Sequence, residues 1–423
     1  MEQTFLTGIN IKKVRHLSDI SIPLSDEKRK HLILTGKNGS GKTSVMEALV
    51  SHIKINFLSS ANRYGVAKDG IRKANDVLER LKDALDLEEN IRMKEDANYQ
   101  LKHWKTELAR WNFDIMADCQ SFSLLRIKYF HGQLVLAYYS ADRKFFVQKY
   151  KNIEKVELKD YYELNDIANE SAGSLLTKYL VDLKATQAFS KDNEKIQRIN
   201  EWFERFESIL QMVFDDKNLR LIFNEETFQF TIHETGREPF DFNTMSSGYA
   251  AVLDIINDLI MRMEAQSRLR VNFDMEGIVL IDEIETHLHL ELQKKILPML
   301  TTLFPNIQFI VSTHSPFILN SLDNAVIYDL EKRMLVSNGM KNLPYEGIVE
   351  GYFGADRLSE ELRNKYERYK VLVSKNELSD EEYAEIDELE YYLDEIPDYL
   401  ATEIATEYSR LKLEFSNREQ LHD

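Results

Sequence analysis

The residues best suited to chemistry form a glycine-rich run near the start of the chain, GKNGSGKTS. Its spacing fits the pattern GxxxxGK[ST], in which glycines let successive backbone N–H groups converge on phosphates at the start of a helix. The lysine of this pattern bridges the β and γ phosphates, and the next hydroxyl is a ligand for Mg²⁺. The sequence therefore predicts an ATP site made of Gly36, Lys37, Asn38, Gly39, Ser40, Gly41, Lys42, Thr43 and Ser44, with Thr43 on the metal.

A second set of chemical residues follows the apolar run GIVLI. A buried strand that ends there would deliver Asp282 to a bound Mg²⁺ and place Glu283 beside it, where a carboxylate can orient and deprotonate the attacking water. Further on, His314 comes just after another apolar run, Ile307–Val311. Because the carboxyl ends of parallel strands face one crevice, we expect His314 to reach the γ phosphate.

These residues must be positioned by a chain that alternates strand and helix patterns. Residues 5–24 alternate apolar and polar positions, which predicts a short antiparallel unit, and HLILT at 31–35 reads as a buried strand. Residues 122–139 also have strand character, and Leu219–Glu234 reads as a hairpin. Strands alternating with helices are typical of a parallel sheet with helices packed on it.

The helical parts of the chain lie between and after these strands. Residues 61–120 have apolar positions at helical spacing but no sustained heptad, which predicts a compact insertion rather than a coiled-coil arm. Beyond residue 340 three helices are expected, one of them starting with a capping box at Ser379 and Glu382. No Lys or Arg interrupts the carboxylates between Glu377 and Glu407, which favours a solvated face or a surface for a basic partner.

Composition sets limits on function. Hydrophobic residues make up 43% of the 423 residues, enough for a large core, and the net charge of −17 argues against a surface that binds nucleic acid throughout. Basic clusters at 12–16 and 143–151 leave local binding open. The single cysteine, Cys119, excludes an internal disulfide and is expected to be a small buried hydrophobe. No run approaches about 18 apolar residues and no signal-peptide core is seen, which predicts a cytoplasmic protein without a membrane partner.

One further segment, MSSGYAAVL, lies about thirty residues before Asp282. With the phosphate loop, the acidic strand and the histidine in this order, the chain resembles the ABC ATPase superfamily, specifically its non-transporter branch of SMC, RecF and overcoming-lysogenization-like proteins. In that family the signature reads LSGGQ, and its Ser and second Gly contact the γ phosphate held by the other subunit. The resemblance implies that Ser246, Ser247 and Gly248 make this contact. The chain departs from the motif at Ser247 and at Tyr249.

The resemblance also sets the expected fold and two further residues. It implies an α/β protein: a P-loop ABC-type ATPase head with a mixed sheet, a compact helical insertion and a C-terminal helical appendage. His289 falls where transporters have the Asp of their D-loop, which favours subunit contact over metal binding, and Arg143 is a candidate for a nucleotide or interface contact. The expected parts are 1–60 with the phosphate loop, 61–120 as the helical insertion, 121–154 as returning strands, 155–218 as a helical subdomain, 219–340 as the signature and acidic-strand lobe, and 341–423 as the acidic appendage.

The implied mechanism is closure of a homodimer around two ATP molecules, followed by hydrolysis, and it leaves room for a higher assembly. Three biological roles are compatible with such an ATPase. An anti-phage defence ATPase resembling the Septu or retron-associated PtuA group would control a separate nuclease or toxin. A RecF-like DNA-repair ATPase should show a concentrated basic groove and contact DNA or RNA. A transporter subunit is disfavoured by the long insertions and the altered signature.

Overall fold

The structure, a computed structural model, describes residues 4–59, 63–84, 87–110, 113–142, 154–158, 162, 164, 175–267, 273–336, 360–375, 378–394 and 402–419. The chain folds into two compact units, residues 1–342 and residues 343–423. Within the described residues, no helix is both long enough and apolar enough to cross a bilayer.

A six-stranded sheet forms the centre of the first unit, with the strand order β11-β10-β3-β9-β8-β5. The five strands from β10 to β5 are parallel, and β11 pairs antiparallel with β10 at the edge. The central strands are buried along their whole length because helices or a second sheet cover both faces. The strands are β3 (His31–Thr35), β5 (Leu134–Tyr139), β8 (Glu276–Ile281), β9 (Ile307–Ser312), β10 (Ala325–Asp329) and β11 (Met334–Val336).

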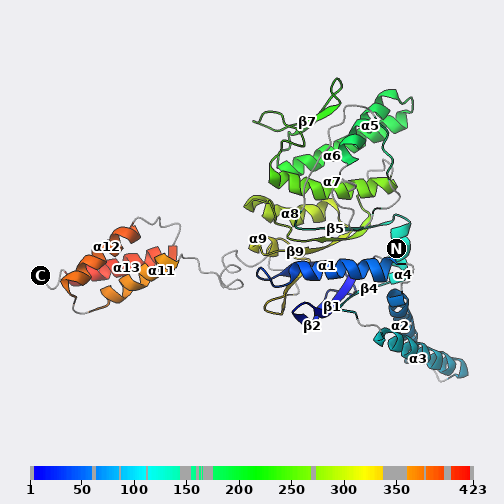
Figure 1. Ribbon diagram of the computed structural model, residues 1–423, viewed down its shortest axis with the longest axis horizontal. Helices are drawn as coiled ribbons and strands as arrows, with labels where there is room; N and C mark the ends of the chain where they lie inside the picture. Colours follow the sequence, from blue (N-terminus) through cyan, green and yellow to red (C-terminus); the bar gives the residue numbers. More distant parts are fainter. Residues whose placement is uncertain are drawn as a thin grey trace. The chain divides into compact units, whose positions relative to one another are not determined.

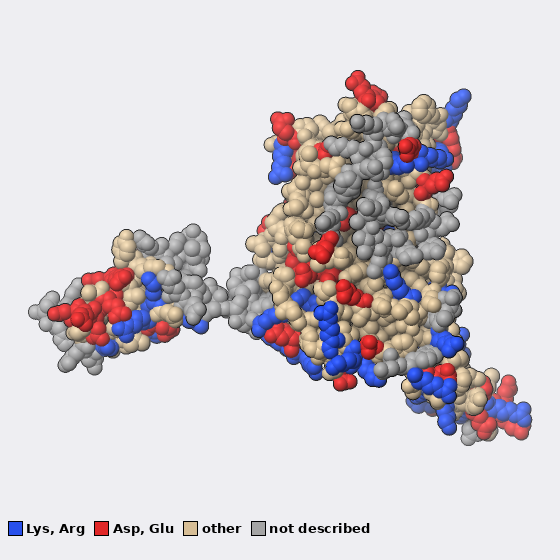
Figure 2. All heavy atoms as spheres, viewed as in Figure 1, with Lys and Arg blue, Asp and Glu red and all other residues tan. Residues whose placement is uncertain are grey.

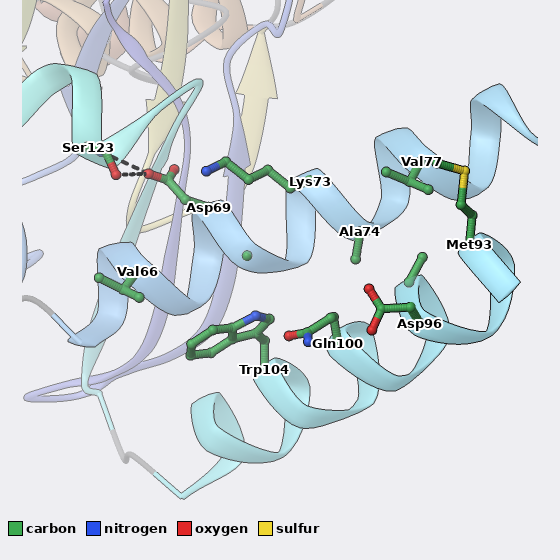
Figure 3. Close-up of a pocket in the computed structure, with 12 residues that line it drawn as sticks. Val66, Asp69, Lys73, Ala74, Val77, Met93, Asp96, Gln100, Trp104 and Ser123 are labelled. Atoms are coloured by element: carbon green, nitrogen blue, oxygen red, sulfur yellow. Dashed lines mark hydrogen bonds between the residues drawn. The ribbon is translucent and has the colours of Figure 1, made fainter.

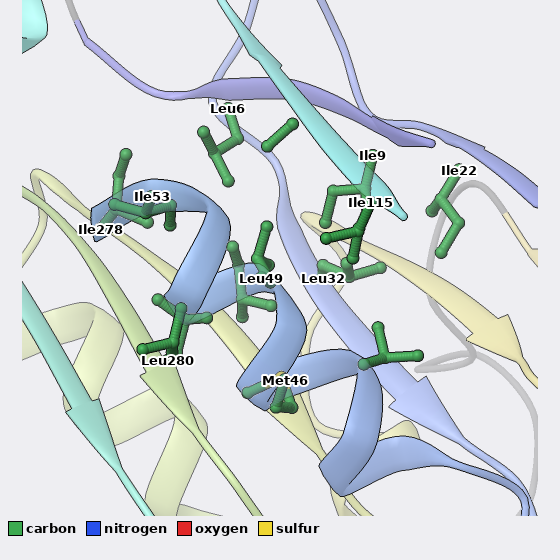
Figure 4. Packing of buried hydrophobic residues seen from close by; sticks show 14 of the residues in the cluster. Leu6, Ile9, Ile22, Leu32, Met46, Leu49, Ile53, Ile115, Ile278 and Leu280 are labelled. Atoms are coloured by element: carbon green, nitrogen blue, oxygen red, sulfur yellow. The ribbon is translucent and has the colours of Figure 1, made fainter. Parts of the chain in front are cut away.

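A smaller sheet covers helix α1 (Lys42–Ile53) on the side away from the central sheet (Figure 1). It consists of β1 (Leu6–Val14), β2 (Leu17–Pro23) and β4 (Ile115–Cys119), all antiparallel, which confirms the predicted antiparallel unit at the start of the chain. Apolar side chains from α1 and from both sheets meet in one core (Figure 4). This core fixes the helix that begins at the phosphate loop.

Two predicted element types differ in the structure. Ile115–Cys119, assigned to the helical insertion, is strand β4, because alternate residues of this segment are buried against α1 while it pairs with β1. Phe122–Phe130, assigned strand character, is helix α4. The side chain of Asp69 accepts hydrogen bonds from the N–H groups of Phe122 and Ser123, and Ser121 caps Leu124. These partners stabilise a helix start that apolar residues alone do not reveal.

The opposite face of the central sheet carries α7 (Ser247–Ser267) and α8 (Leu290–Leu303), with α5 (Leu176–Phe189) and α6 (Asn193–Phe214) beyond them (Figure 1). The buried carboxylate of Glu264 on α7 accepts hydrogen bonds from Tyr179 of α5, at 2.7 Å, and from Trp202 of α6, at 3.1 Å. It thereby joins three helices. The predicted hairpin is confirmed as β6 (Arg220–Asn224) and β7 (Gln229–His233), and α9 (Pro316–Leu319) follows β9.

The insertion after α1 consists of the π-helix η1 (Lys54–Leu58) followed by α2 (Arg63–Arg80) and α3 (Glu88–Ala109), which pack against each other. A hollow of about 490 Å³ lies between α2 and α3, lined by Trp104 and Met93 on one side and by Val66, Lys73 and Val77 on the other (Figure 3). Asp69 lies at the edge of this hollow with its carboxylate turned toward α4. The hollow is thus separate from the phosphate loop.

The second unit contains α11 (Glu360–Val373), α12 (Asp380–Asp394) and α13 (Thr402–Glu419) around a small apolar core. The predicted capping box is confirmed: Ser379 N donates to Glu382 Oε2 at 3.1 Å, and Glu382 N donates to Ser379 Oγ at 3.3 Å. Tyr369 is fully buried at the centre of the core.

Candidate functional site

The phosphate loop joins β3 to α1 through three glycines with positive φ: Gly36 at 133°, Gly39 at 84° and Gly41 at 98°. At Gly36 a Cβ would lie 2.8 Å from Ser40 Oγ, and at Gly41 a Cβ would lie 2.9 Å from Leu17 Cδ1. The positive φ disfavours any other residue at all three positions, and at Gly36 and Gly41 an added Cβ would also crowd a neighbouring side chain. Ser40 N donates to the carbonyl of Lys37 at 3.0 Å, which closes a tight turn within the loop.

No side chain caps the first N–H groups of helix α1. Its N-cap, Gly41, provides no side-chain hydrogen bond, and the first turn contains no acidic residue. The buried side chain of Lys42 folds back, so that Nζ donates to the carbonyls of Gly36 at 2.8 Å and Lys37 at 3.2 Å. The positive end of the helix and this ammonium group thus meet at one point, which suits a phosphate.

The loop after β10 supports the phosphate loop from outside. Leu330 N donates to the carbonyl of Thr35, and Asp329 Oδ1 accepts from the N–H groups of Glu331 and Lys332. Glu331 then forms an ion pair with the side chain of Lys37 at 3.0 Å. Because this pair is exposed, its main effect is to restrict the loop rather than to add much stability.

The two predicted acids follow β8, next to the end of β9. Asp282 is fully buried, and its N–H donates to the carbonyl of Tyr139 on β5 at 2.8 Å. The hydroxyl of Ser312 donates to the Asp282 carboxylate and accepts the N–H of Glu283 at 2.8 Å. Glu283 has a φ of 44°, which an L-residue adopts only at a cost in conformational energy. One hydroxyl therefore fixes both acids at the start of a tight turn.

Two residues beyond Glu283, the turn supplies a partner for His314. Glu285 Oε1 accepts the main-chain N–H of His314 at 2.7 Å and lies 2.9 Å from its Nδ1. Burial, the largest single effect, acts to raise the pKa of Glu285, but the hydrogen bonds from His314, together with those from the Glu285 main chain and the Thr313 side chain, leave that pKa below its usual range. In return, the hydrogen bond to Glu285 raises the pKa of His314 above 6.5, against partial burial, which lowers it.

The charges of the site interact directly. Lys42 lowers the pKa of His314 and Glu283 raises it, so both side chains lie within electrostatic reach of His314 although the three come from distant parts of the chain. The register explains why: Leu34 of β3 pairs with Ser312 of β9, and Ile281 of β8 pairs with Val311. The phosphate loop, the acids and His314 therefore follow three neighbouring parallel strands at the same edge of the sheet.

The signature-like residues lie at the start of α7. Ser246 and Ser247 are exposed, whereas Gly248 is buried: a Cβ on Gly248 would lie 3.2 Å from the carbonyl oxygen of His287. Helices α7 and α1 cover opposite faces of the central sheet (Figure 1). The structure thus brings Ser246–Gly248 next to the turn that follows Glu283, on the other face from helix α1.

The remaining predicted residues have separate positions. Tyr249, which replaces the polar residue of the family signature, stacks on Phe214 at 4.3 Å between ring centroids and meets the edge of the His289 ring at 6.1 Å. His289 is exposed at the N-cap of α8. In the parts of the chain that the structure describes, no group of three or more His, Cys, Asp or Glu could hold a metal ion. Arg143 lies outside the described residues.

Cys119 is buried, as predicted, and burial raises the pKa of its thiol. The basic cluster at 12–16 is exposed around the β1–β2 turn, apart from Val14. Figure 2 shows Lys and Arg side chains near β1 and β2, with acidic side chains among them. This face is therefore mixed in charge rather than uniformly basic.

The sequence did not single out Ser312 or Glu285. Their signal is positional: Ser312 is the last residue of β9 and Glu285 follows the end of β8 by four residues, so both belong to the same edge as Asp282. Recognising their partners requires knowing that β8 and β9 are neighbours.

A glycine loop follows β3, and the paired acids follow β8, which is separated from β3 by β9 alone. This is the architecture of a P-loop ATPase. The sequence profile of the family described as "AAA domain, putative AbiEii toxin, Type IV TA system" matches residues 32–320, and the chain belongs to this family.

Several characterised sequences are similar to parts of the chain. "Septu protein PtuA" of Bacillus mycoides (strain KBAB4) is 29% identical over 199 residues, covering 45% of this chain and 27% of that protein. "Retron Ec83 probable ATPase" of Escherichia coli is 27% identical over 270 residues, covering 57% of this chain and 49% of that protein. These matches confirm the predicted resemblance, although the chain spans at most about half the length of these relatives.

Among solved structures, an SMC head bound to the C-winged helix domain of ScpA aligns over 80% of this chain and 100% of that chain, with a TM-score of 0.39 and 15% identity.

Proposed function

We propose that this ATPase domain binds ATP with Mg²⁺ at the phosphate loop and hydrolyses it with Glu283 as the general base. The proposal is carried by one observation: Lys42, Glu283 and His314 follow neighbouring parallel strands, and the charges of Lys42 and Glu283 both act on His314. The backbone of residues 36–44 would hold the phosphates, and Lys42 would exchange its two carbonyl partners for phosphate oxygens.

The residues present fit a magnesium ion. Thr43 offers an exposed hydroxyl in the first turn of α1, and Asp282 offers a carboxylate, both hard oxygen donors of the kind that Mg²⁺ prefers. When bound, the ion would neutralise charge on the phosphates. Glu283 would orient a water molecule and take its proton, and His314 would donate a hydrogen bond to the γ phosphate.

A complete site is proposed to need two chains. Ser246 and Ser247 are exposed beside Gly248, at the start of a helix that covers the opposite face of the sheet from α1. In a head-to-head homodimer, these residues would contact the γ phosphate held by the partner, and His289 would lie at the interface. Each chain then supplies one loop and one signature, so ATP would link two copies.

This mechanism is tested with Glu283→Gln, which keeps the size of the side chain but removes the base. With ATP and Mg²⁺ we expect tight binding, no turnover and a shift of mass to a dimer in light scattering. Lys42→Ala should bind ATP about tenfold to a hundredfold more weakly, the effect of losing a charge-assisted hydrogen bond, and should stay monomeric. Lys28→Ala, at an exposed site, is the matched control. Normal turnover by Glu283→Gln would exclude its assigned role.

We further propose that the ATPase regulates a separate effector, a nuclease or toxin, in anti-phage defence. The similarity to Septu and retron-associated ATPases supports this role, and the described residues contain no metal-binding group of His, Cys, Asp and Glu of the kind that a metal-dependent nuclease would need. Affinity purification of the chain from its host, with and without Glu283→Gln, tests the proposal. A stoichiometric nuclease or toxin is expected. Recovery of DNA or RNA with no protein partner would favour a RecF-like repair ATPase.

A further inference from the structure

The contact between Glu285 and His314 is unusual because two donors of one residue share one oxygen. Both the main-chain N–H and Nδ1 of His314 lie within hydrogen-bond distance of Glu285 Oε1, at 2.7 and 2.9 Å. The side chain of Glu285 is 6% exposed, whereas that of His314 is 50% exposed. The carboxylate is therefore held inside the fold, whereas the imidazole is bound through Nδ1 and remains half exposed.

This arrangement decides which proton the histidine can offer. A neutral imidazole has a single N–H group, and with a carboxylate as partner at Nδ1 the proton stays on that atom. Nε2 is then a hydrogen-bond acceptor, and it cannot form a hydrogen bond with a phosphate oxygen, which is also an acceptor. Only the imidazolium form carries a second N–H at Nε2 while keeping the bond to Glu285.

We propose that Glu285 is a positioning residue that keeps His314 as an imidazolium, with Nδ1–H bound to Glu285 and Nε2–H left for a γ-phosphate oxygen of ATP. This inference deepens the proposed ATPase function and rests on it for the role of Nε2. Glu285 does not touch the reacting atoms; it sets the charge and the orientation of the group that does.

The charges around His314 agree with this assignment. Glu285 and Glu283, both in the turn after β8, favour the protonated ring, and Lys42 of α1 opposes it. The bond to Glu285 is the largest of these effects and raises the pKa of His314. A bound triphosphate would add negative charge on the open side of the ring and would favour the same form.

The first test measures the histidine itself and needs no nucleotide. In the full chain labelled with ¹³C at histidine Cε1, the His314 signal is assigned by its loss in His314→Gln and is followed through a pH titration. In Glu285→Gln, which retains an acceptor oxygen but no charge, the pKa of His314 should fall. Glu264→Gln is the matched control, because Glu264 is also a buried glutamate with two donors, about 24 Å along α7 from Gly248. An unchanged pKa in Glu285→Gln would overturn the proposal.

The second test measures turnover. The imidazolium is present below its pKa and is lost above it, so ATP hydrolysis should decline as the pH rises through that value. In Glu285→Gln this decline should begin at a lower pH, whereas Glu264→Gln should keep the wild-type profile. A merely structural role for Glu285 would lower the rate equally at every pH, and that result would contradict the proposal.

A further variant guards against misfolding. Glu285→Asp retains the charge on a shorter side chain and should recover part of the raised pKa of His314; a pKa as low as in Glu285→Gln would argue against a role for the charge. If the wild-type chain does not hydrolyse ATP, the proposed function fails, while the titration still decides whether Glu285 sets the protonation of His314.

Discussion

Gly248, at the start of α7, lies against the main-chain carbonyl of His287: a Cβ at Gly248 would approach that oxygen to 3.2 Å and Leu292 Cδ1 to 3.3 Å. The signature-like segment and the turn after Glu283 are thus in direct contact within one chain. His287 and Glu283 both have positive φ, which leaves this turn few alternative conformations. A displacement of Ser246–Gly248 by a partner molecule would therefore change the position of Glu283, the proposed general base.

The substitution Gly248→Ala tests this contact. The added methyl group should displace the turn or the start of α7 slightly, because its contacts with the carbonyl and with the Leu292 side chain would be tighter than ordinary van der Waals contacts. We expect ATP binding to the phosphate loop to persist, but the ATP-dependent dimer and its turnover to fall at least about tenfold, for a loss of about 1–3 kcal/mol. Light scattering and a phosphate-release assay measure both.

Gly8→Ala is the control for that experiment, because a Cβ at Gly8 would lie at an ordinary contact distance, 3.6 Å from Ile22 O. Equal effects of the two substitutions would mean that the Gly248 contact has no special role.

Ser312→Ala should reduce turnover more than ATP affinity. The hydroxyl of Ser312 donates to Asp282 and accepts from Glu283 N, so its removal leaves a buried carboxylate with one fewer donor and frees the start of the turn. A loss of about 1–3 kcal/mol corresponds to about a tenfold to hundredfold decrease in kcat. Ser321→Ala removes a hydroxyl that bonds only the neighbouring carbonyl of Ile318, at 2.7 Å, and should leave kcat unchanged. A wild-type kcat for Ser312→Ala would contradict the role of this hydroxyl.

Asp69→Ala should destabilise the first unit. The Asp69 carboxylate accepts two main-chain N–H groups of α4, at 3.0 and 2.9 Å, and the hydroxyl of Ser123. Losing it leaves the start of α4 without these acceptors and should cost about 1–3 kcal/mol. Urea unfolding, followed by tryptophan fluorescence, measures the change. Asp76→Ala, on the exposed face of the same helix, should change stability little, and similar losses for both would refute the capping role.

Acid should weaken the fold through buried neutral histidines. Burial is the main cause that lowers the pKa of His31 from 6.5 to about 4, and His52 is affected in the same way. His31 Nδ1 accepts the N–H of Phe309 at 3.1 Å, which requires the neutral ring. Between these two pH values each histidine is protonated in the unfolded chain but neutral in the folded chain. The free energy of unfolding therefore falls as the pH falls from about 6.5 to about 4, by about 3 kcal/mol for each histidine. Above pH 6.5 this cause has no effect.

The comparison of wild type with His31→Asn isolates this effect. Asparagine presents an acceptor near the position of Nδ1 but cannot be protonated, so the free energy of unfolding should depend less steeply on pH between about 4 and 6.5. Parallel curves for the two proteins would show that His31 is protonated equally in both states.

Much of the fold was predictable where the signal is local. HLILT, the N-terminal antiparallel unit, the hairpin and the capping box at Ser379 depend on residues close together in sequence, and each prediction is confirmed. Helix α4 was missed because its start depends on Asp69, a residue 53 positions earlier. Strand β4 was missed because five residues beside a long helical pattern give little periodicity, and pairing with β1 decides their conformation.

The residues of the candidate site likewise fall into those that the local sequence predicts and those that it does not. The phosphate loop and the Asp-Glu pair are contiguous motifs, so they can be recognised from neighbouring residues, although Ser312 and Glu331 help to hold them in place. Ser312 and Glu285 take their roles from the pairing of two strands, and the sequence alone does not state which strands are neighbours. The contact of Gly248 with His287 likewise joins a helix to a turn through tertiary packing.

The pairing of Ile281 with Val311 has an evolutionary consequence. Because side chains alternate along a strand, deleting or inserting a single residue within β8 or β9 would turn Ser312 away from Asp282. The segment from His289 to Asn306 connects the two strands but belongs to neither, so its length does not decide on which face of the sheet Ser312 lies. Length differences among active homologues should therefore fall in that connection, outside the buried face of α8, while length changes inside either strand should be found only in copies that have lost activity.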